Sequence, residues 1–435
     1  MSPLSQPDLS QTKTRRRSPG KLWLFRGLTV LVCAGLLELI SLLAWQIAPP
    51  LRLDQFKENV TQVSRLGTDR KNDLEVLHPY VGWAFNPDAS NIPGHVDDLT
   101  VNSLGFADTG PSLRKRSPDK LLVGVFGGSV AQQMTNSGGA EFRKRLESSP
   151  KLRGRQVEIV RLALSGFKQP QQIMALNYVL ALGGEFDVIV NIDGFNEVAL
   201  TVTENDALKV FLAYPRSWSA RLQDVVDPRA SSISYRLLGI RATRQARSRW
   251  MQTPLRYSWT MSFIWAAQDQ ILRATLLDLS EELIKFDQGH GKGFARQGPK
   301  QLYSNETEMY QQVTSLWANC SRQMHDLCAA RGIPYLHCLQ PNQYLEGSKP
   351  LSEKELDKFY APHSDHALAI KRGYPELMAA GEQLRDSGIR FYDLTQLFAQ
   401  EKDTIYSDYF CHYNAQGTNM LSRAVADEIL AALPD

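Results

Sequence analysis

The sequence predicts an α/β fold in which helices cover both faces of a parallel sheet. Short apolar, β-rich runs alternate along the chain with segments whose apolar residues have helical spacing. Strands that are apolar on both faces are typical of parallel sheets buried on both sides. The 435 residues, 43% hydrophobic and 22% charged, suffice for one large folded domain or two of ordinary size.

The chain begins with a basic, polar tail and an apolar segment. Residues 27–47 carry a single charge, Glu38, and a helix of roughly 20 apolar residues crosses a bilayer. Basic residues precede this segment, whereas the charges after it are mixed. The positive-inside rule therefore predicts a cytoplasmic tail (1–26), one transmembrane helix (27–47) and an extracytoplasmic remainder, periplasmic if the cell is Gram-negative. A cleaved signal peptide is the alternative. We interpret Glu38 as a tolerated charge rather than as a contact to a partner helix.

A lead-in segment, residues 48–118, separates the apolar helix from the main domain, residues 119–435. The lead-in is rich in Pro, Gly, Asn and Asp, which predicts short strands and turns. Strands of the main domain are expected at 121–127, 157–164, 186–194, 333–341 and 389–395. Helices are expected at 170–182, 308–332, 374–388 and 418–433.

Residues 198–305 interrupt this alternation and are interpreted as a helical insertion over one end of the sheet. The insertion holds four tryptophans and a basic run from Arg236 to Arg249. An amphipathic helix with solvated arginines is the favoured interpretation. The alternative is a lid whose basic face attracts an anionic polymer or lipid headgroups.

Charge and cysteine usage exclude some classes of function. The net charge of +3, without a concentrated basic face, gives no support to nucleic-acid binding. The cysteines match no zinc pattern. Cys320 and Cys328 fall eight residues apart in one predicted helix, too far for a bridge between them, so any disulfide outside the cytoplasm would be of longer range.

Small and polar residues gather where three predicted strands end and before the last helix. In a parallel sheet these positions share one edge, where ligands bind. The segments are Gly127-Gly128-Ser129, Ser165-Gly166, Asp193–Glu197 and 407–417, the last of which carries Asp408 and His412.

The glycine pair before Ser129 has three possible explanations. A phosphate-binding loop would need a lysine that is absent, and a dinucleotide fingerprint would need a further glycine. A plain tight turn and a displayed nucleophile remain. A nucleophilic serine needs a base to accept its proton, and His412 is the best candidate.

These segments carry a resemblance to a known family. Ser129, Gly166, Asn196 and His412 occur in the order of the four sequence blocks of the SGNH (GDSL-type) hydrolases, and residues 76–435 resemble the bacterial membrane-anchored type in organisation. The resemblance implies a flavodoxin-like three-layer α/β/α sandwich, preceded here by the transmembrane helix. It also implies ester or acyl chemistry without a metal or organic cofactor.

The resemblance further implies a role for each site residue. Ser129 would be the nucleophile and His412 its general base, oriented by Asp408. The backbone N–H groups of Ser129 and Gly166 and the amide of Asn196 would form the oxyanion hole. Asp408 lies four residues before His412, whereas the usual family spacing is three. Either the loop bulges to compensate, or Ser129 and His412 work as a dyad.

A polar loop after the fourth predicted strand could bind substrate. Gln340 and Asn342 suit a sugar, although Pro341 and Asn342 are also ordinary turn formers, which is the favoured interpretation.

We expect a membrane-anchored extracytoplasmic serine esterase or O-acyltransferase that acts on ester-linked acyl groups of an envelope or secreted polysaccharide. Hydrolysis and transfer remain open, because both use the same serine. A lipid esterase at the membrane surface and a non-catalytic glycan-binding or assembly protein are the alternatives.

Overall fold

The computed structural model describes residues 19–47, 74–88, 100–222, 228–290 and 294–433. The chain divides into two compact units, Met1–Thr68 with Tyr235–Glu282 and Asp69–Ser234 with Leu283–Asp435.

The larger unit is built on a parallel five-stranded sheet of order β4-β3-β5-β6-β7. This order is that of flavodoxin-like folds, in which the chain reverses direction across the sheet beside its first strand. The predicted α/β fold with a parallel sheet is therefore confirmed. The strands are β3 (Lys120–Gly127), β4 (Gln156–Arg161), β5 (Val188–Asp193), β6 (Tyr335–Leu339) and β7 (Arg390–Asp393).

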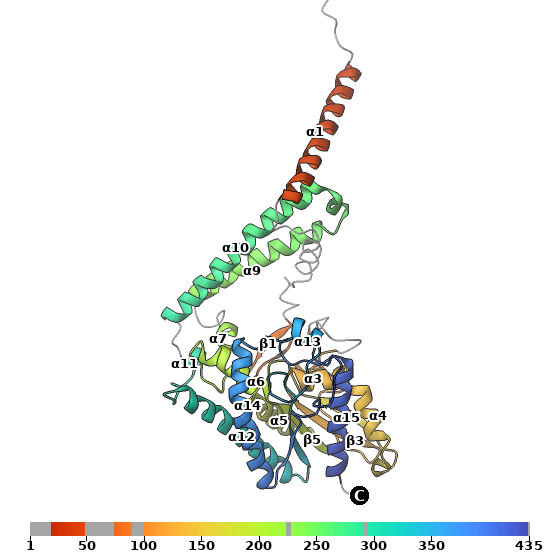
Figure 1. Cartoon of the computed structure of the whole chain (residues 1–435), viewed down its shortest axis with the longest axis vertical. Helices are drawn as coiled ribbons and strands as arrows, with labels where there is room; N and C mark the ends of the chain where they lie inside the picture. Colours follow the sequence, from red (N-terminus) through yellow and green to blue (C-terminus); the bar gives the residue numbers. More distant parts are fainter. Residues whose placement is uncertain (1–18, 48–73, 89–99, 223–227, 291–293, 434–435) are drawn as a thin grey trace, which may run out of the picture. The chain divides into compact units, whose positions relative to one another are not determined.

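Two groups of helices cover the sheet (Figure 1). One group packs together around α4 and contains α3 (Ser129–Asn136), α4 (Gly139–Glu147) and α15 (Ala415–Ala432). The other group contains α5 (Gln171–Ala181), α6 (Phe195–Leu200), α12 (Glu306–Ala329) and α14 (Asp365–Asp386). The central strands are buried on both faces because helices lie on both sides: every residue of β5 is buried.

All four helices predicted for the sheet domain are observed, with one large difference in a boundary. The segment predicted at 374–388 begins earlier, at Asp365, where the Ser364 side chain accepts a hydrogen bond from the N–H of Ala367 and caps the helix. Pro375 therefore lies inside α14 instead of near its start. Cys320 and Cys328 share α12 as predicted, and all five cysteines are free.

The described part of the lead-in segment forms a small antiparallel hairpin of β1 (Glu75–His78) and β2 (Gly82–Phe85), which confirms short strands there. The rest of the lead-in lies partly outside the described residues. Trp83 of β2 is fully buried with its ring edge-on to Phe167, at 5.1 Å between centroids. Gln171 of α5 donates to the Val81 carbonyl at 2.8 Å. The hairpin is thereby fixed to the loop that follows β4.

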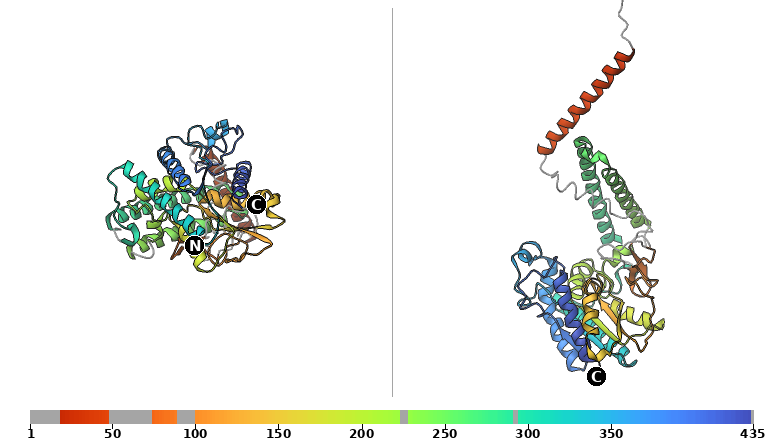
Figure 2. Two further views of the ribbon diagram at one scale, coloured as in Figure 1. Left: turned by 90° about the horizontal axis from the view of Figure 1, so that it is seen from below. Right: turned by 90° about the vertical axis from the view of Figure 1, so that its right-hand side faces the viewer.

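In the described residues, the smaller unit contains α1 (Pro19–Ile47) and most of the two long helices α9 (Pro228–Trp250) and α10 (Trp259–His290). Within α1, Trp23–Gln46 is long and apolar enough to span a membrane, with a mean hydropathy of 2.2. The basic run predicted to be helical lies in α9. α9 and α10 run side by side in Figure 1 and in the right-hand view of Figure 2, and the guanidinium of Arg244 joins them through two hydrogen bonds to the carboxylate of Asp269, at 2.6 and 3.1 Å.

Glu38 of α1 has polar partners at the start of α10, so the expectation that its charge is simply tolerated is wrong. Its carboxylate accepts hydrogen bonds from the Ser258 hydroxyl, from the N–H of Trp259 at 2.6 Å and from the N–H of Thr260 at 3.3 Å. The free N–H groups and the dipole at a helix N-terminus favour such a negative charge. Glu38 thus joins α1 to the first turn of α10.

Candidate active site

Three of the sequence-predicted site residues follow the strands at which the strand order reverses. β3 is flanked by β4 on one side and β5 on the other, and the loops that leave these three strands carry Ser129, Gly166 and Asn196. The carboxyl ends of strands at such a reversal form the usual ligand-binding crevice of an open α/β sheet.

Ser129 is the first residue of α3 and follows two glycines that have close neighbours. Gly127 has φ +140°, and a Cβ there would lie 2.0 Å from the carbonyl oxygen of Ile192. A Cβ on Gly128 would lie 2.2 Å from Nδ2 of Asn196. The two glycines therefore bring the backbone of the serine turn against β5 and the Asn196 side chain.

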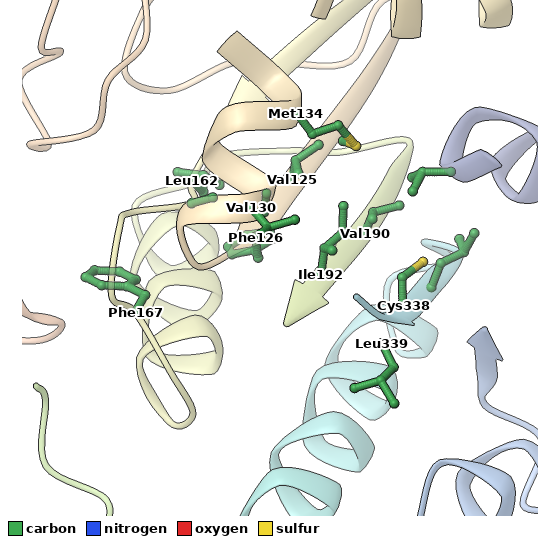
Figure 3. Close-up of a cluster of buried hydrophobic side chains, with 14 of the residues drawn as sticks. Val125, Phe126, Val130, Met134, Leu162, Phe167, Val190, Ile192, Cys338 and Leu339 are labelled. Atoms are coloured by element: carbon green, nitrogen blue, oxygen red, sulfur yellow. The ribbon is translucent and has the colours of Figure 1, made fainter. Parts of the chain in front are cut away.

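Helix α3, which follows this turn, packs on two central strands of the sheet. Val130 and Met134 of α3 are buried against Val125, Phe126, Val190 and Ile192 of β3 and β5 (Figure 3). Because the apolar face of α3 is fixed on two central strands, its first residue, the half-buried Ser129, has a defined position.

Asn196 and the loop after β4 meet at the same place. Nδ2 of Asn196 donates to the carbonyl oxygen of Phe167 at 2.8 Å, which fixes the amide beside Gly128. Gly166 has φ +87°, and a Cβ there would lie 2.2 Å from Nε of Arg216. The structure thus brings the Ser129 turn, the Gly166 loop and Asn196 together, with Arg216 packed over Gly166.

A buried carboxyl group supports the two loops. Glu197 accepts hydrogen bonds from the N–H of Gly194 at 2.8 Å, from the N–H of Gln169 at 3.1 Å and from the Gln172 amide at 3.1 Å. Burial, assisted by the charge of Asp193, raises the pKa of Glu197 to about 8. Glu197 therefore links the loops that carry Gly166 and Asn196.

Asp408 and His412 are in direct contact despite their four-residue spacing. Nδ1 of His412 lies 2.5 Å from Oδ2 of Asp408. Oδ1 of Asp408 accepts from the N–H of Phe410 at 2.8 Å and from the N–H of His412 at 3.2 Å. Cys411 takes a positive φ of 63°. The extra residue is therefore absorbed by a tight bulge, which was one of the two outcomes that the spacing left open.

The contact with His412 also affects the acidity of Asp408. Burial alone would raise the pKa of Asp408, but the hydrogen bond and charge of His412 and two backbone N–H groups hold that pKa below its usual value. The carboxylate is thus kept in the charged form that pairs with an imidazolium.

Gln133 joins α3 to the histidine loop. Its Nε2 donates to the carbonyl of Tyr413 at 2.6 Å, and its Oε1 accepts from the N–H of Tyr413 at 3.2 Å. Gln133 lies one helical turn after Ser129, and Tyr413 follows His412 directly. Among the described residues no hydrogen bond joins Ser129 to His412 itself, a contact that often closes only when substrate binds.

The side chains of Gln340 and Asn342 are buried, 4% and 0% exposed. The amide oxygen of Asn342 accepts from the N–H of Tyr344 at 3.0 Å and from the Cys411 thiol at 3.2 Å. Asn342 thus supports the loop that carries His412, and a substrate contact from Gln340 or Asn342 stays a prediction.

Within the described ranges, no three His, Cys, Asp or Glu side chains gather closely enough to hold a metal ion.

Sequence reasoning missed three contributors to this region: Gln133, Glu197 and Arg216. Glu197 belongs to the predicted segment Asp193–Glu197 but has no role in the sequence interpretation, although its place directly after Asn196 is a signal. Gln133 lies one turn after a candidate nucleophile, which is a weak signal. Arg216 belongs to the insertion, and no local pattern connects it to Gly166.

Comparisons with protein families, curated proteins and solved structures gave matches only among the solved structures. No protein-family model and no curated protein matches the chain. Among solved structures, the crystal structure of an acetyl xylan esterase, AlAXEase, matches with 14% sequence identity and a TM-score of 0.32, and the match covers 72% of this chain and 100% of the other.

Proposed function

We propose that the protein is a serine esterase or O-acyltransferase of the SGNH type, anchored in a membrane by α1, with its sheet domain outside the cytoplasm. We further propose that it acts on ester-linked acyl groups of an envelope or secreted polysaccharide. The observation that carries the proposal is the Asp408–His412 pair, tied through Gln133 to the helix that begins at Ser129.

The proposed reaction begins with attack on an ester carbonyl. Oγ of Ser129 forms a bond to the carbonyl carbon while Nε2 of His412 accepts the hydroxyl proton. Asp408 accepts a hydrogen bond from Nδ1–H of His412, so that Nε2 is the basic nitrogen, and it stabilises the imidazolium that forms. A serine without such a base is a weak nucleophile at neutral pH.

The negative charge of the tetrahedral intermediate needs preformed donors. We assign this role to the backbone N–H groups of Ser129 and Gly166 and to Nδ2 of Asn196. Loss of one such donor lowers the catalytic rate about 10²–10³-fold. His412 then protonates the leaving sugar oxygen, which leaves an acyl group on Ser129. Water or a second sugar hydroxyl, deprotonated by His412, accepts the acyl group and restores the serine.

The test uses the full chain in detergent with p-nitrophenyl acetate and an O-acetylated polysaccharide. Acetate release should disappear in Ser129→Ala and persist in Ser137→Ala, an exposed serine just past the end of the same helix. Transfer to an added sugar acceptor distinguishes a transferase from a hydrolase. A strict preference for long-chain lipid esters would contradict the proposed substrate class. A folded protein that turns over neither ester would contradict the proposed enzymatic activity.

A further inference from the structure

A groove of about 520 Å³ lies in the larger unit. Three segments line it: the β1–β2 turn, the first residues of α5, and the stretch that leads into α7 (Trp218–Arg221). Neither the site described above nor its proposed chemistry uses this groove.

Aromatic rings line the groove, and neighbouring rings fix them in place. Tyr80, 64% exposed, stacks on Tyr178 with 5.2 Å between ring centroids. Tyr214 meets Trp218 edge to face at 5.8 Å, and the indole N–H of Trp218 donates to the Ala295 carbonyl at 2.8 Å. Rings that are held before a ligand arrives cost little conformational entropy on binding. The groove therefore offers preformed, half-exposed aromatic faces.

The lining carries little charge. Among the described residues that border the groove there is no Asp, Glu, Lys or Arg. His78 is the one titratable base there, and burial lowers its pKa. Its Nδ1 accepts hydrogen bonds from the N–H groups of Tyr80 and Val81, both at 3.2 Å, which favours the neutral ring. An uncharged, aromatic and partly solvent-exposed surface suits a ligand that has apolar faces and hydroxyl groups along its edges. A neutral sugar is such a ligand.

Two features connect the groove lining with the loop that carries Gly166. Pro170 and Gln171 of its lining directly follow the loop that starts at Gly166. Arg216 lies between the lining residues Pro215 and Trp218, and its guanidinium packs over Gly166. A sugar chain bound in the groove would therefore contact the segment that directly follows the Gly166 loop of the candidate site.

We propose that this groove binds the sugar chain of an uncharged polysaccharide whose acyl ester is presented to Ser129. The inference rests on the proposed function and adds the chemistry of the substrate: a neutral polymer recognised by stacking on Tyr80 and Trp218. A small ester such as p-nitrophenyl acetate needs none of these contacts.

The experiment compares two substrates in the full chain: O-acetylated oligosaccharides of a neutral β-glucan and p-nitrophenyl acetate. Tyr80→Ala should raise KM for the glycan about tenfold, since a ring-to-ligand stack of this kind is worth roughly one order of magnitude in affinity. Its kcat/KM for p-nitrophenyl acetate should not change. Tyr80→Trp should restore glycan binding, and Trp218→Ala should repeat the loss.

Trp250→Ala is the matched control, because Trp250 is an exposed indole of α9 that does not line the groove. An unchanged glycan KM in both groove variants, or an equal loss of kcat/KM for both substrates, would overturn the groove assignment. Neither result would contradict the proposed esterase activity. If the wild type turns over neither ester, the proposed function fails. The groove is then tested by calorimetric titration with the same oligosaccharides, where wild-type binding that Tyr80→Ala abolishes supports it and no binding overturns it.

Discussion

The side-chain amide of Gln133 holds the backbone of Tyr413 by two hydrogen bonds, one donated and one accepted. The two residues are 280 positions apart in the chain, yet each neighbours a proposed catalytic group, Ser129 and His412. Because an uncharged amide makes both bonds, this link between nucleophile and base is independent of pH.

Loss of the link should impair chemistry more than binding. We expect Gln133→Ala to lower kcat for p-nitrophenyl acetate by about tenfold with little change in KM, since misplacement of a base by a fraction of an ångström slows proton transfer. Gln133→Glu, which can still accept from the Tyr413 N–H, should lose less. Steady-state kinetics measures both variants, and a rise in KM at constant kcat would show that Gln133 acts on substrate binding instead.

The Asp408–His412 contact predicts that the aspartate orients the base. We expect Asp408→Asn to lower kcat by about 10²–10⁴, because an amide at that position no longer stabilises the imidazolium or selects the right tautomer. Asp403→Asn, an exposed position in the same region, is the matched control. Near-normal turnover in Asp408→Asn would favour a Ser129–His412 dyad.

Gly128 should tolerate no side chain. A Cβ there would lie 2.2 Å from Nδ2 of Asn196 and 3.1 Å from the Phe167 carbonyl oxygen, and so would push the amide out of place. We expect Gly128→Ala to lower kcat at least 10²-fold, as loss of one oxyanion donor does. Gly139→Ala is the control, because the nearest atom to its added Cβ is 3.5 Å away. Equal effects of the two alanines on kcat would refute the proposed role of Asn196.

The raised pKa of Glu197 predicts that the free energy of unfolding depends on pH. Its pKa is raised from the usual 4.5 to about 8, so between these pH values the folded protein keeps a proton that the unfolded chain has lost. The free energy of unfolding should therefore fall as pH rises through this window. Urea unfolding at pH 5 and pH 8 should show a smaller decrease for Glu197→Gln than for wild type, whereas the exposed Glu353→Gln should behave like wild type. The opposite order would contradict a retained proton on Glu197.

The sheet and the serine turn could be predicted because local pattern encodes them. The apolar run of β5 is buried on both faces, as a continuous apolar run predicts, and Gly127 marks a turn whose positive φ favours glycine. The contact of Asp408 with His412 could not be decided from spacing, since it depends on the positive φ of Cys411.

Features that depend on distant parts of the chain could not be predicted in the same way. The apolar neighbours of Glu38 in sequence do not reveal its partners, which are Ser258 and the first two residues of α10, Trp259 and Thr260. The aromatic groove likewise combines the lead-in hairpin with the start of the insertion, two segments that carry no shared motif.

The central claim, that Ser129 is a nucleophile activated by His412, is tested most directly by covalent labelling. The full chain in detergent is treated with a fluorophosphonate, and the modified peptide is identified by mass spectrometry. The account predicts one adduct, on Ser129, with no labelling in Ser129→Ala and strongly slowed labelling in His412→Ala. A folded wild type that remains unlabelled, or an adduct on another serine, would contradict it.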